Sequence, residues 1–424
     1  MSPDQTLRRL RCLPLLLLWL PGLCSAAASG ASALFETLRD RVFQVRVVDI
    51  ASGDKTTIGS GFRVDSAGLV ATNFHVVSLL IHEPAKYRIE LLGQDGLTRP
   101  ATVLAIDVLH DLAILRGQQA DGPAFGLTSG TPGQGERIYS MGNPEDLGMT
   151  IIEGNYNGLI AASRFERLLF SGSLNPGMSG GPAFDRHGAV VGVNVAKGGE
   201  QLGFLVPAAH LQALLRRANE TAVPGDLKAE IARALLEDSN TFFDQRLQET
   251  WHRGRFGELS LPRDLSPSLK CWGQNTETKE SDYSRFHQQC QSQEYLFLTE
   301  DFYTGDFSYS YEWLNAGRLN PFQFYTAVTH RYTHTSLENV DDAEQVTNFR
   351  CTTDFVRIDG TAWKASICLR RYLEYPGLND ASLVLVSLHS NRDAAIIRMA
   401  AAGIHRERAL ALFQKLMRAI EWTR

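Results

Sequence analysis

The sequence predicts two domains, an all-β domain followed by an α+β domain. A chain of 424 residues is too long for one ordinary core, so two domains are the default expectation. Residues 34–207 contain short alternating segments separated by Gly, Pro, Asn and Asp, which is the pattern that a pair of β-barrels requires. Residues 268–424 alternate again and then end in a helical stretch, which indicates the α+β class.

Residues 1–26 predict an export signal. Three arginines precede the apolar run 13–20, and small residues follow at 25–28. The run is too short to span a membrane, so we expect no stable span after cleavage, with an uncleaved anchor as the alternative. We expect export across the inner membrane to the periplasm. The formal net charge of −5 gives no indication of nucleic-acid binding.

Helices are expected at the boundary between the two domains. A closing helix over 207–217 carries Leu211, Leu214 and Leu215 at helical spacing. It ends the first domain, which we place at residues 34–217. Residues 223–226 (Val-Pro-Gly-Asp) mark the boundary. Leu227, Ile231, Leu235 and Leu236 then predict a helical linker over 226–260, and a break near Ser239 is left open.

The second domain, residues 268–424, is rich in aromatic residues. Phe307, Tyr309, Tyr311 and Trp313 alternate, which places them on one face of a strand. We interpret that face as a sheet core, with a peptide- or glycan-binding face as the alternative. Residues 383–388 predict the final strand. Residues 404–422 predict a helix with a buried stripe of Ala409, Phe413, Leu416 and Ile420.

Four cysteines lie in the second domain and allow three pairings. Asp359 and Gly360 form a two-residue hairpin signal, and a hairpin centred there places Cys351 opposite Cys368 in a non-hydrogen-bonded pair. Such pairs bring the Cβ atoms near disulfide distance. We therefore predict a Cys351–Cys368 bridge, which leaves Cys271–Cys290 as the second. A metal site made of the same cysteines is the alternative, but no CxxC pair occurs.

Three motifs in the first domain carry the candidate chemistry. Residues 72–77 contain His75, residues 110–115 contain Asp111, and the glycine-flanked stretch 175–182 (Asn-Pro-Gly-Met-Ser-Gly-Gly-Pro) contains Ser179. The chain order His, Asp, Ser is that of chymotrypsin-type proteases. A serine hydroxyl is a poor nucleophile until a base removes its proton, and His75 is the candidate base. Asp111 would hold the imidazole in the required tautomer.

The glycines around the serine meet a backbone requirement. Gly177 can adopt a positive φ without steric cost, so the amides of Gly177 and Ser179 can converge on one point. These two amides are the predicted oxyanion hole for a tetrahedral intermediate.

With these motifs, the first domain resembles the trypsin-like protease domain of the HtrA (Deg) family. The matching stretches are 59–62 (Gly-Ser-Gly-Phe), 70–77, 111–115, 141–144 (Met-Gly-Asn-Pro), 148–150 and 202–207. The resemblance covers a little under half of the chain. It implies a chymotrypsin-like fold of two packed six-stranded barrels, with the triad in the cleft between them.

The resemblance also implies a substrate pocket and shows departures. Ser173 should lie at the pocket base, and one wall should comprise Val193, Asn194, Val195 and Ala196. A pocket with no acid at its base should prefer apolar side chains of small to medium size. Met178 stands where mammalian trypsin-like enzymes carry an aspartate that pairs with a freed N-terminus, so we expect no such activation. After Arg217 the sequence contains no loop that suggests a PDZ module, the usual partner domain of the family.

Two competing site assignments are less favoured. Asp107 competes with Asp111, but it lacks the apolar strand that follows Asp111 and is interpreted as the cap of a turn. His330 and His334 lie on one face of an expected strand and could suggest a metal site. No carboxylate or cysteine is spaced to complete it, so we interpret them as exposed strand residues and expect no metal.

The sequence thus predicts an exported serine endopeptidase that acts on proteins or peptides without a cofactor. One alternative is a catalytically silent, protease-like binding scaffold. Another is a chaperone-like role in which the second domain captures unfolded chains. The sequence leaves the oligomeric state open.

Overall fold

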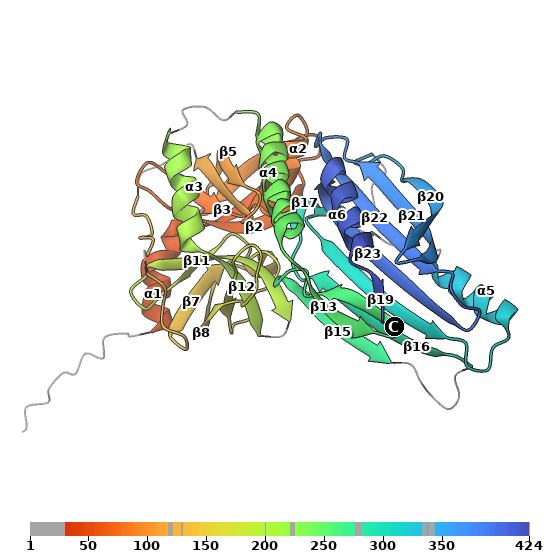
Figure 1. Ribbon diagram of the computed structural model, residues 1–424. Coiled ribbons are helices and arrows are strands. Elements are labelled where there is room, and N and C mark those ends of the chain that lie inside the picture. Colours follow the sequence, from red (N-terminus) through yellow and green to blue (C-terminus); the bar gives the residue numbers. More distant parts are fainter. Residues whose placement is uncertain are drawn as a thin grey trace, which may run out of the picture.

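The computed structural model describes residues 30–117, 122–128, 130–199, 201–220, 225–275, 282–332, 337 and 344–423. The expected signal peptide, residues 1–26, lies outside them. Within the described ranges, no helix is long and apolar enough to cross a membrane. Figure 1 shows two β-rich halves with a long helix between them.

The N-terminal half contains two closed antiparallel barrels, preceded by helix α1 (Ala31–Leu38). The first comprises β1 (Val42–Asp49), β2 (Lys55–Arg63), β3 (Leu69–Thr72), β4 (Tyr87–Leu92), β5 (Thr98–Asp107) and β6 (Leu112–Gly117). The second comprises β7 (Arg137–Gly142), β8 (Thr150–Leu159), β9 (Leu168–Phe170), β10 (Pro182–Phe184), β11 (Val190–Gly199) and β12 (Leu202–Pro207). The predicted chymotrypsin-like double barrel is confirmed.

Two helices complete this half. Helix α2 (Phe74–His82) follows β3, and α3 (Ala208–Glu220) follows the last strand. As predicted, α3 is a closing helix that buries Leu211 and Leu214 and packs Leu215 at the edge of the same core. That core contains side chains from both barrels, such as Phe62 and Phe184, so the two barrels are packed together.

Helix α4 (Leu227–Gln248) joins the two halves. The Asp226 carboxylate accepts a hydrogen bond from the backbone N–H of Ala229, which caps the first turn. The helix runs unbroken through Ser239, whose hydroxyl donates to the carbonyl of Gly403 at 2.6 Å. Its first half packs Ile231 into a core shared with the first barrel, and its second half packs Phe243 into the core of the C-terminal domain. The expected helical linker over 226–260 is therefore helical only to Gln248, because residues 252–256 and 259–263 form strands, and its helical part contributes to both cores.

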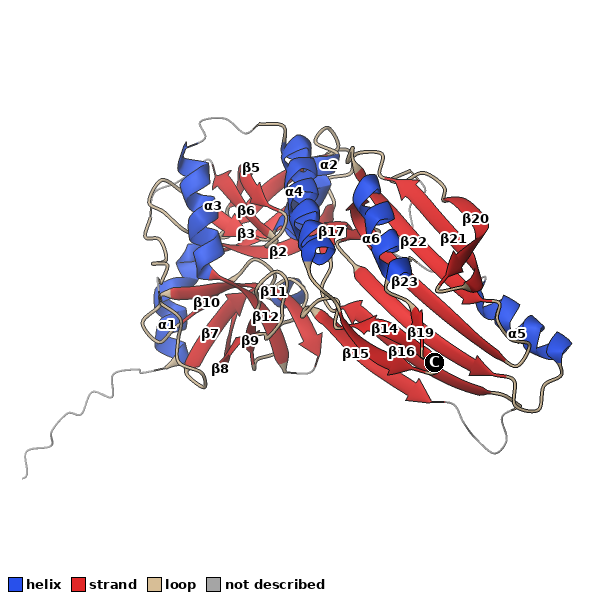
Figure 2. Cartoon of the chain, in the orientation of Figure 1, coloured by secondary structure: helices blue, strands red, loops and turns tan. Residues whose placement is uncertain are grey.

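A seven-stranded antiparallel sheet organises the C-terminal half (Figure 2). In spatial order it comprises β15 (Leu269–Asn275), β16 (Ser284–Ser292), β19 (Phe307–Asn315), β23 (Asp393–His405), β22 (Leu378–Ser387), β21 (Thr361–Arg371) and β20 (Arg350–Ile358). Helices α4 and α6 (Arg406–Arg418) pack on it, and α5 (Pro321–Tyr332) follows β19. A smaller sheet has the order β13 (His252–Phe256), β14 (Leu259–Arg263) and β24 (Glu421–Trp422). A two-stranded sheet pairs β17 (Leu296–Thr299) with β18 (Phe302–Thr304).

Several expectations for this half are resolved by the structure. The aromatic face of β19 is buried in the domain core, so it is not an open binding face. Residues 383–387 of the expected final strand 383–388 fall in β22, which is not the final strand, because β23 follows it in the centre of the sheet. The last helix ends at Arg418 rather than at residue 422, and Glu421–Trp422 pair with β14 instead.

Both predicted disulfides are present. Cys351 faces Cys368 across β20 and β21, and Cys271 faces Cys290 across β15 and β16, with a Cα–Cα distance of 4.0 Å in each pair. The β20–β21 turn has positive φ at Asp359 and Gly360, as a type I′ hairpin requires. The turn sequence therefore sets the register that makes the bridge possible.

The C-terminal half packs directly on α2. His82, in the last turn of α2, donates from Nδ1 to the Ser78 carbonyl at 2.8 Å, so its Nε2 accepts from the Tyr375 hydroxyl at 2.7 Å. Burial lowers the pKa of His82, the charge of Lys228 adds to this, and the Ser78 carbonyl and the charge of Glu374 partly offset it.

Acidification is therefore expected to destabilise the protein. The unfolded chain regains the ordinary histidine pKa of 6.5, so it takes up a proton before folded His82 does. The free energy of unfolding should fall as the pH drops from above 6.5 through the lowered pKa. Thermal unfolding at about pH 7.5 and about pH 5.5 measures this. His82→Gln should reduce the pH dependence, and an unchanged pH dependence would contradict the prediction.

Candidate active site

His75 and Asp111 form a two-point contact. The Nδ1–H of His75 donates to Asp111 Oδ2 at 2.7 Å, and the backbone N–H of His75 donates to Asp111 Oδ1 at 2.9 Å. His75 lies in the first turn of α2, and Asp111 lies just before β6. Because Nδ1 carries the proton, Nε2 remains available as an acceptor.

The backbone around Asp111 is held in an uncommon conformation. Asp111 has a φ of 58°, and its carbonyl accepts a hydrogen bond from the side-chain amide of buried Asn73 at 2.7 Å. Asn73 directly precedes α2, so this bond ties the aspartate turn to the start of the helix that carries His75. The sequence gives a signal for Asn73 only through its place in the histidine motif.

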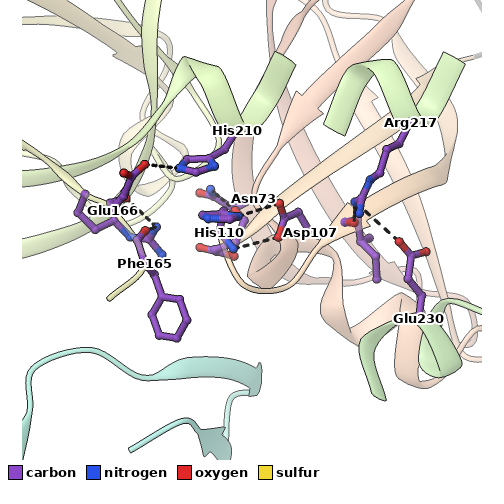
Figure 3. A network of polar contacts seen from close by, with 11 residues as sticks. Asn73, Asp107, His110, Phe165, Glu166, His210, Arg217 and Glu230 are labelled. Carbon is purple, nitrogen blue, oxygen red and sulfur yellow. Dashed lines mark hydrogen bonds and ion pairs between the residues drawn. The ribbon is translucent and has the colours of Figure 1, made fainter. Parts of the chain in front are cut away.

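The competing carboxylate Asp107 has a different partner (Figure 3). It accepts hydrogen bonds from the backbone N–H of His110 at 3.1 Å and from His110 Nδ1 at 2.8 Å. Burial raises the pKa of Asp107, but its hydrogen bonds to His110 and the charges of His110 and Arg217 outweigh this and lower it overall. The His110 ring stacks on His210 with ring centroids 3.6 Å apart. Asp107 thus orders the turn before Asp111, as the sequence indicates.

The turn that carries Ser179 packs tightly against Ser60 in β2 and Asn73 at the start of α2. The Ser179 carbonyl accepts from the backbone N–H of Ser60 at 2.7 Å. A Cβ on Gly180 would lie 2.2 Å from the Ser60 carbonyl oxygen and 3.0 Å from the backbone nitrogen of Asn73. Only glycine permits so close an approach. The three motifs, far apart in sequence, therefore meet at the start of α2.

The hydroxyl of Ser179 donates to the Val195 carbonyl at 3.0 Å. Val195 is the extra residue of a β-bulge in β11, because pairing with β12 passes from Asn194 to Ala196. The bulge leaves the Val195 carbonyl available for the serine. A hydrogen bond between Ser179 and His75 is not made in this conformation. Catalytic hydrogen bonds are often formed only in the substrate complex.

The peptide before Gly177 is oriented by the loop after β7. The Pro176 carbonyl accepts from the backbone N–H of Glu145 at 2.9 Å. In a trans peptide the N–H points opposite to the C=O, so the Gly177 N–H is directed away from Glu145. The Gly177 N–H donates a hydrogen bond to none of the described residues. Gly177 has a φ of 93°, and a Cβ there would lie 2.4 Å from the Asn143 carbonyl oxygen.

The peptide before Ser179 is oriented in the same way. The Met178 carbonyl accepts from the backbone N–H of Gly181 at 3.0 Å and from the Asn194 side-chain amide at 3.2 Å. The Ser179 N–H, on the opposite side of that peptide, has no acceptor among the residues that the structure describes. The N–H groups of Gly177 and Ser179 thus lie beside the serine, and neither donates a hydrogen bond within the described residues.

Gly177→Ala is expected to lower turnover by displacing one of the two proposed oxyanion donors. Alanine is strained at a φ of 93°, and its Cβ would collide with the Asn143 carbonyl, so the peptide must rotate and remove the Gly177 N–H from its position. Loss of one oxyanion donor typically lowers turnover by about 100- to 1000-fold. Steady-state kinetics on a fluorogenic peptide measures this. Gly126→Ala, at a glycine with no neighbour within 4 Å of the added Cβ, is the control.

The proposed pocket residues lie in two different settings. Ser173 is half-buried in the loop after β9. Val193 and Asn194 are fully buried, so their side chains pack behind the site. Val195 is half-buried, and the Ala196 side chain lies outside the described part of the structure. This strand can therefore meet a substrate mainly through its backbone, and Asn194 positions the Met178 carbonyl instead.

Met178 is also fully buried, among apolar side chains of the second barrel such as Leu174 and Phe170. It therefore belongs to the barrel core.

The expectation for the two histidines of the C-terminal half was wrong for His330. It lies in helix α5 rather than on a strand, because the aromatic and aliphatic residues 321–332 bury one helical face on the sheet. His334 lies outside the described residues. Within the described ranges, no group of three His, Cys, Asp or Glu side chains is arranged to hold a metal ion.

Sequence reasoning missed a half-buried cation, Arg167, whose electrostatic partners include the aspartate. Burial lowers the pKa of Arg167, and the charges of Asp111, Glu294 and Asp107 partly offset this. Glu294 belongs to the C-terminal half, so no local motif in the first domain could have indicated this grouping.

Comparison with known proteins agrees with a trypsin-like peptidase domain in the first half of the chain. Residues 59–193 match the model of a trypsin-like peptidase domain. The serine protease HTRA2, mitochondrial, of Drosophila pseudoobscura pseudoobscura is 31% identical over 210 residues, which is 47% of each chain. The corresponding Drosophila willistoni protein is 30% identical over 228 residues, covering 48% of this chain and 52% of that protein. The chain spans about half the length of the curated relatives it matches.

Among solved structures, the Rv3671c protease in an inactive form aligns with 44% of this chain and 92% of its own, at 20% identity and a TM-score of 0.37. The fold assignment stands on the two closed barrels themselves. Together with the family model, these barrels identify residues 59–193 as a trypsin-like peptidase domain, which is similar in sequence to the HTRA2 serine proteases.

Proposed function

We propose that this protein is a serine endopeptidase that hydrolyses peptide bonds in proteins through Ser179, His75 and Asp111. The observation that carries the proposal is the contact of His75 with Asp111 through both carboxylate oxygens, beside a glycine turn that presents Ser179. The two unused N–H groups of Gly177 and Ser179 support it further. Apart from water, the proposed chemistry needs only these side chains and amides.

In the proposed reaction, the Ser179 side chain rotates, so that its hydroxyl donates its hydrogen bond to His75 Nε2 instead of the Val195 carbonyl. The hydroxyl oxygen bonds to the scissile carbonyl carbon while its proton passes to Nε2. The Gly177 and Ser179 amides stabilise the negative oxygen. The imidazolium then protonates the leaving amine as the C–N bond breaks. Water, deprotonated by His75, hydrolyses the acyl-enzyme and restores Ser179.

The finer parts of the proposal concern substrate and location. We propose cleavage after apolar residues of small to medium size, because Ser173 offers no charge at the proposed pocket base. The Cys271–Cys290 and Cys351–Cys368 bridges favour an oxidising compartment. Together with the signal-like residues 1–26, they support export to the periplasm.

A fluorophosphonate probe tests the activity directly. The purified mature chain, residues 27–424, should be labelled covalently at Ser179 and should cleave casein. Ser179→Ala should abolish both. A basic preference before the scissile bond, in a peptide library, would contradict the proposed pocket.

One observation favours a second candidate function, a silent protease-like scaffold. The Ser179 hydroxyl is bonded to the Val195 carbonyl and not to His75 in this conformation. If that state is permanent, the probe should fail to label the protein even with a substrate-like peptide present. Labelling that requires Ser179 would exclude the scaffold.

A further inference from the structure

The C-terminal domain brings an aromatic side chain to His75. Phe297, in β17, lies edge-on to the imidazole, with ring centroids 5.8 Å apart and an interplanar angle of 66°. The neighbour of the proposed general base is thus supplied by the other half of the chain, more than 200 residues away in sequence.

The hairpin that carries Phe297 is firmly held. Leu296, Leu298 and Phe302 are buried in one core with the first barrel and α2. On the other side, the Glu294 carboxylate accepts from the backbone N–H of Arg164, in the β8–β9 loop of the second barrel, at 2.8 Å. Both barrels therefore fix the position of β17, and its aromatic side chain is not carried on a free flap.

The opposite face of the hairpin is aromatic. Because side chains alternate along a strand, Phe297 and Tyr295 face away from the buried leucines. Tyr303 is the β18 partner of Phe297 and lies between the other two, with centroids 5.6 Å from Phe297 and 4.6 Å from Tyr295. We call these three side chains the aromatic row. It begins at His75 and ends at Tyr295, which is 61% exposed.

The row flanks His75 without covering it. The His75 side chain remains 26% exposed, and Phe297 and Tyr303 are only half-buried. Aromatic faces of this kind gain from contact with another apolar side chain, and exposed apolar surface beside a site indicates a binding role. A peptide bound across Ser179 and His75 must pass next to this surface.

We propose that the aromatic row is a specificity-determining surface, which receives an apolar or aromatic side chain of the substrate next to the scissile bond. This inference rests on the proposed function, since it assigns the same site a substrate class. The C-terminal domain then completes the substrate-binding surface.

Matched peptides test the proposal. In quenched-fluorescent peptides, Ala is replaced by Phe at each position flanking the scissile bond in turn. At one position, the Phe peptide should have a kcat/KM about threefold to tenfold higher, as an aromatic contact provides. Phe297→Ala should bring that ratio to about one, and Phe297→Tyr should retain it. Tyr295→Ala, at the exposed end of the aromatic row, should lower the ratio less. Because Tyr295 is exposed, this variant still tests the row if Phe297→Ala does not fold.

The control is Phe355→Ala, which removes an aromatic side chain that is 68% exposed on β20. It should leave the ratio unchanged. If no variant alters the preference, the proposal is overturned. It is equally overturned if Phe297→Ala accelerates every peptide alike, because the ring would then be an obstruction.

A binding measurement separates this inference from the proposed function. Fluorescence anisotropy of the same peptides on Ser179→Ala, with and without Phe297→Ala, needs no turnover. A Phe preference that depends on Phe297 supports the aromatic row even if the wild-type chain never cleaves. Equal binding of Ala and Phe peptides would overturn the row even if the wild-type chain is an active peptidase.

Discussion

Ser179→Ala is expected to lower turnover by about 10⁴-fold or more. The substitution removes the only atom that forms the acyl bond in the proposed reaction, so the remaining oxyanion donors and binding contacts account for any residual rate. The kcat/KM for a fluorogenic peptide measures the loss. The fold should be retained, since the hydroxyl makes a single hydrogen bond, to the Val195 carbonyl.

The stability of this variant decides how the loss is interpreted. A hydrogen bond of this type contributes about 0.5–1.5 kcal/mol to the free energy of unfolding, so thermal unfolding should shift only slightly. Ser171→Ala removes an exposed hydroxyl eight residues earlier and should keep full activity. If Ser179→Ala retains turnover within tenfold of wild type, Ser179 is not the nucleophile.

Asp111→Asn is expected to lower kcat by about 10⁴-fold. In the present contact, both carboxylate oxygens accept from His75, one from Nδ1–H and one from the backbone N–H. An asparagine side chain has only one oxygen. When its NH₂ group faces the ring, His75 must accept at Nδ1 and carry its proton on Nε2. That tautomer cannot take the Ser179 proton.

Asp107→Asn is the matched control for this prediction. It changes the same chemical group four residues earlier, but its partner is His110. We expect it to retain kcat within about tenfold, with any change arising from a looser turn before β6. A larger loss in Asp107→Asn than in Asp111→Asn would exchange the two assignments. Fluorophosphonate labelling rates should follow the same order as kcat.

The first domain was predictable because its signals are local and repeated. Each strand is short and bounded by turn residues, and each proposed catalytic residue lies in a stretch whose neighbours are typical of its role. The Cys351–Cys368 bridge was predictable for a related reason. Asp359 and Gly360 define the register of the hairpin, and the register alone places the two cysteines opposite each other.

The C-terminal half was less predictable, because its pattern depends on burial that the sequence does not show. Strand β23 lies at the centre of the sheet and is buried on both faces over most of its length, so its alanines and isoleucines show no alternation. His330 was expected to lie on a strand, but it lies in α5 because one face of that helix is buried on the sheet. In both cases the packing partner decided the conformation.

By itself, the sequence determined which residues could do chemistry and which cysteines could pair, because both depend on short stretches with fixed geometry. Only the tertiary structure decided what surrounds that chemistry. The Ser179 hydroxyl bonds to the Val195 carbonyl because a bulge in β11 frees that carbonyl. Phe297 lies against His75 because the buried face of its hairpin shares a core with the first barrel. Such contacts join segments far apart along the chain, and no local pattern of residue types encodes them.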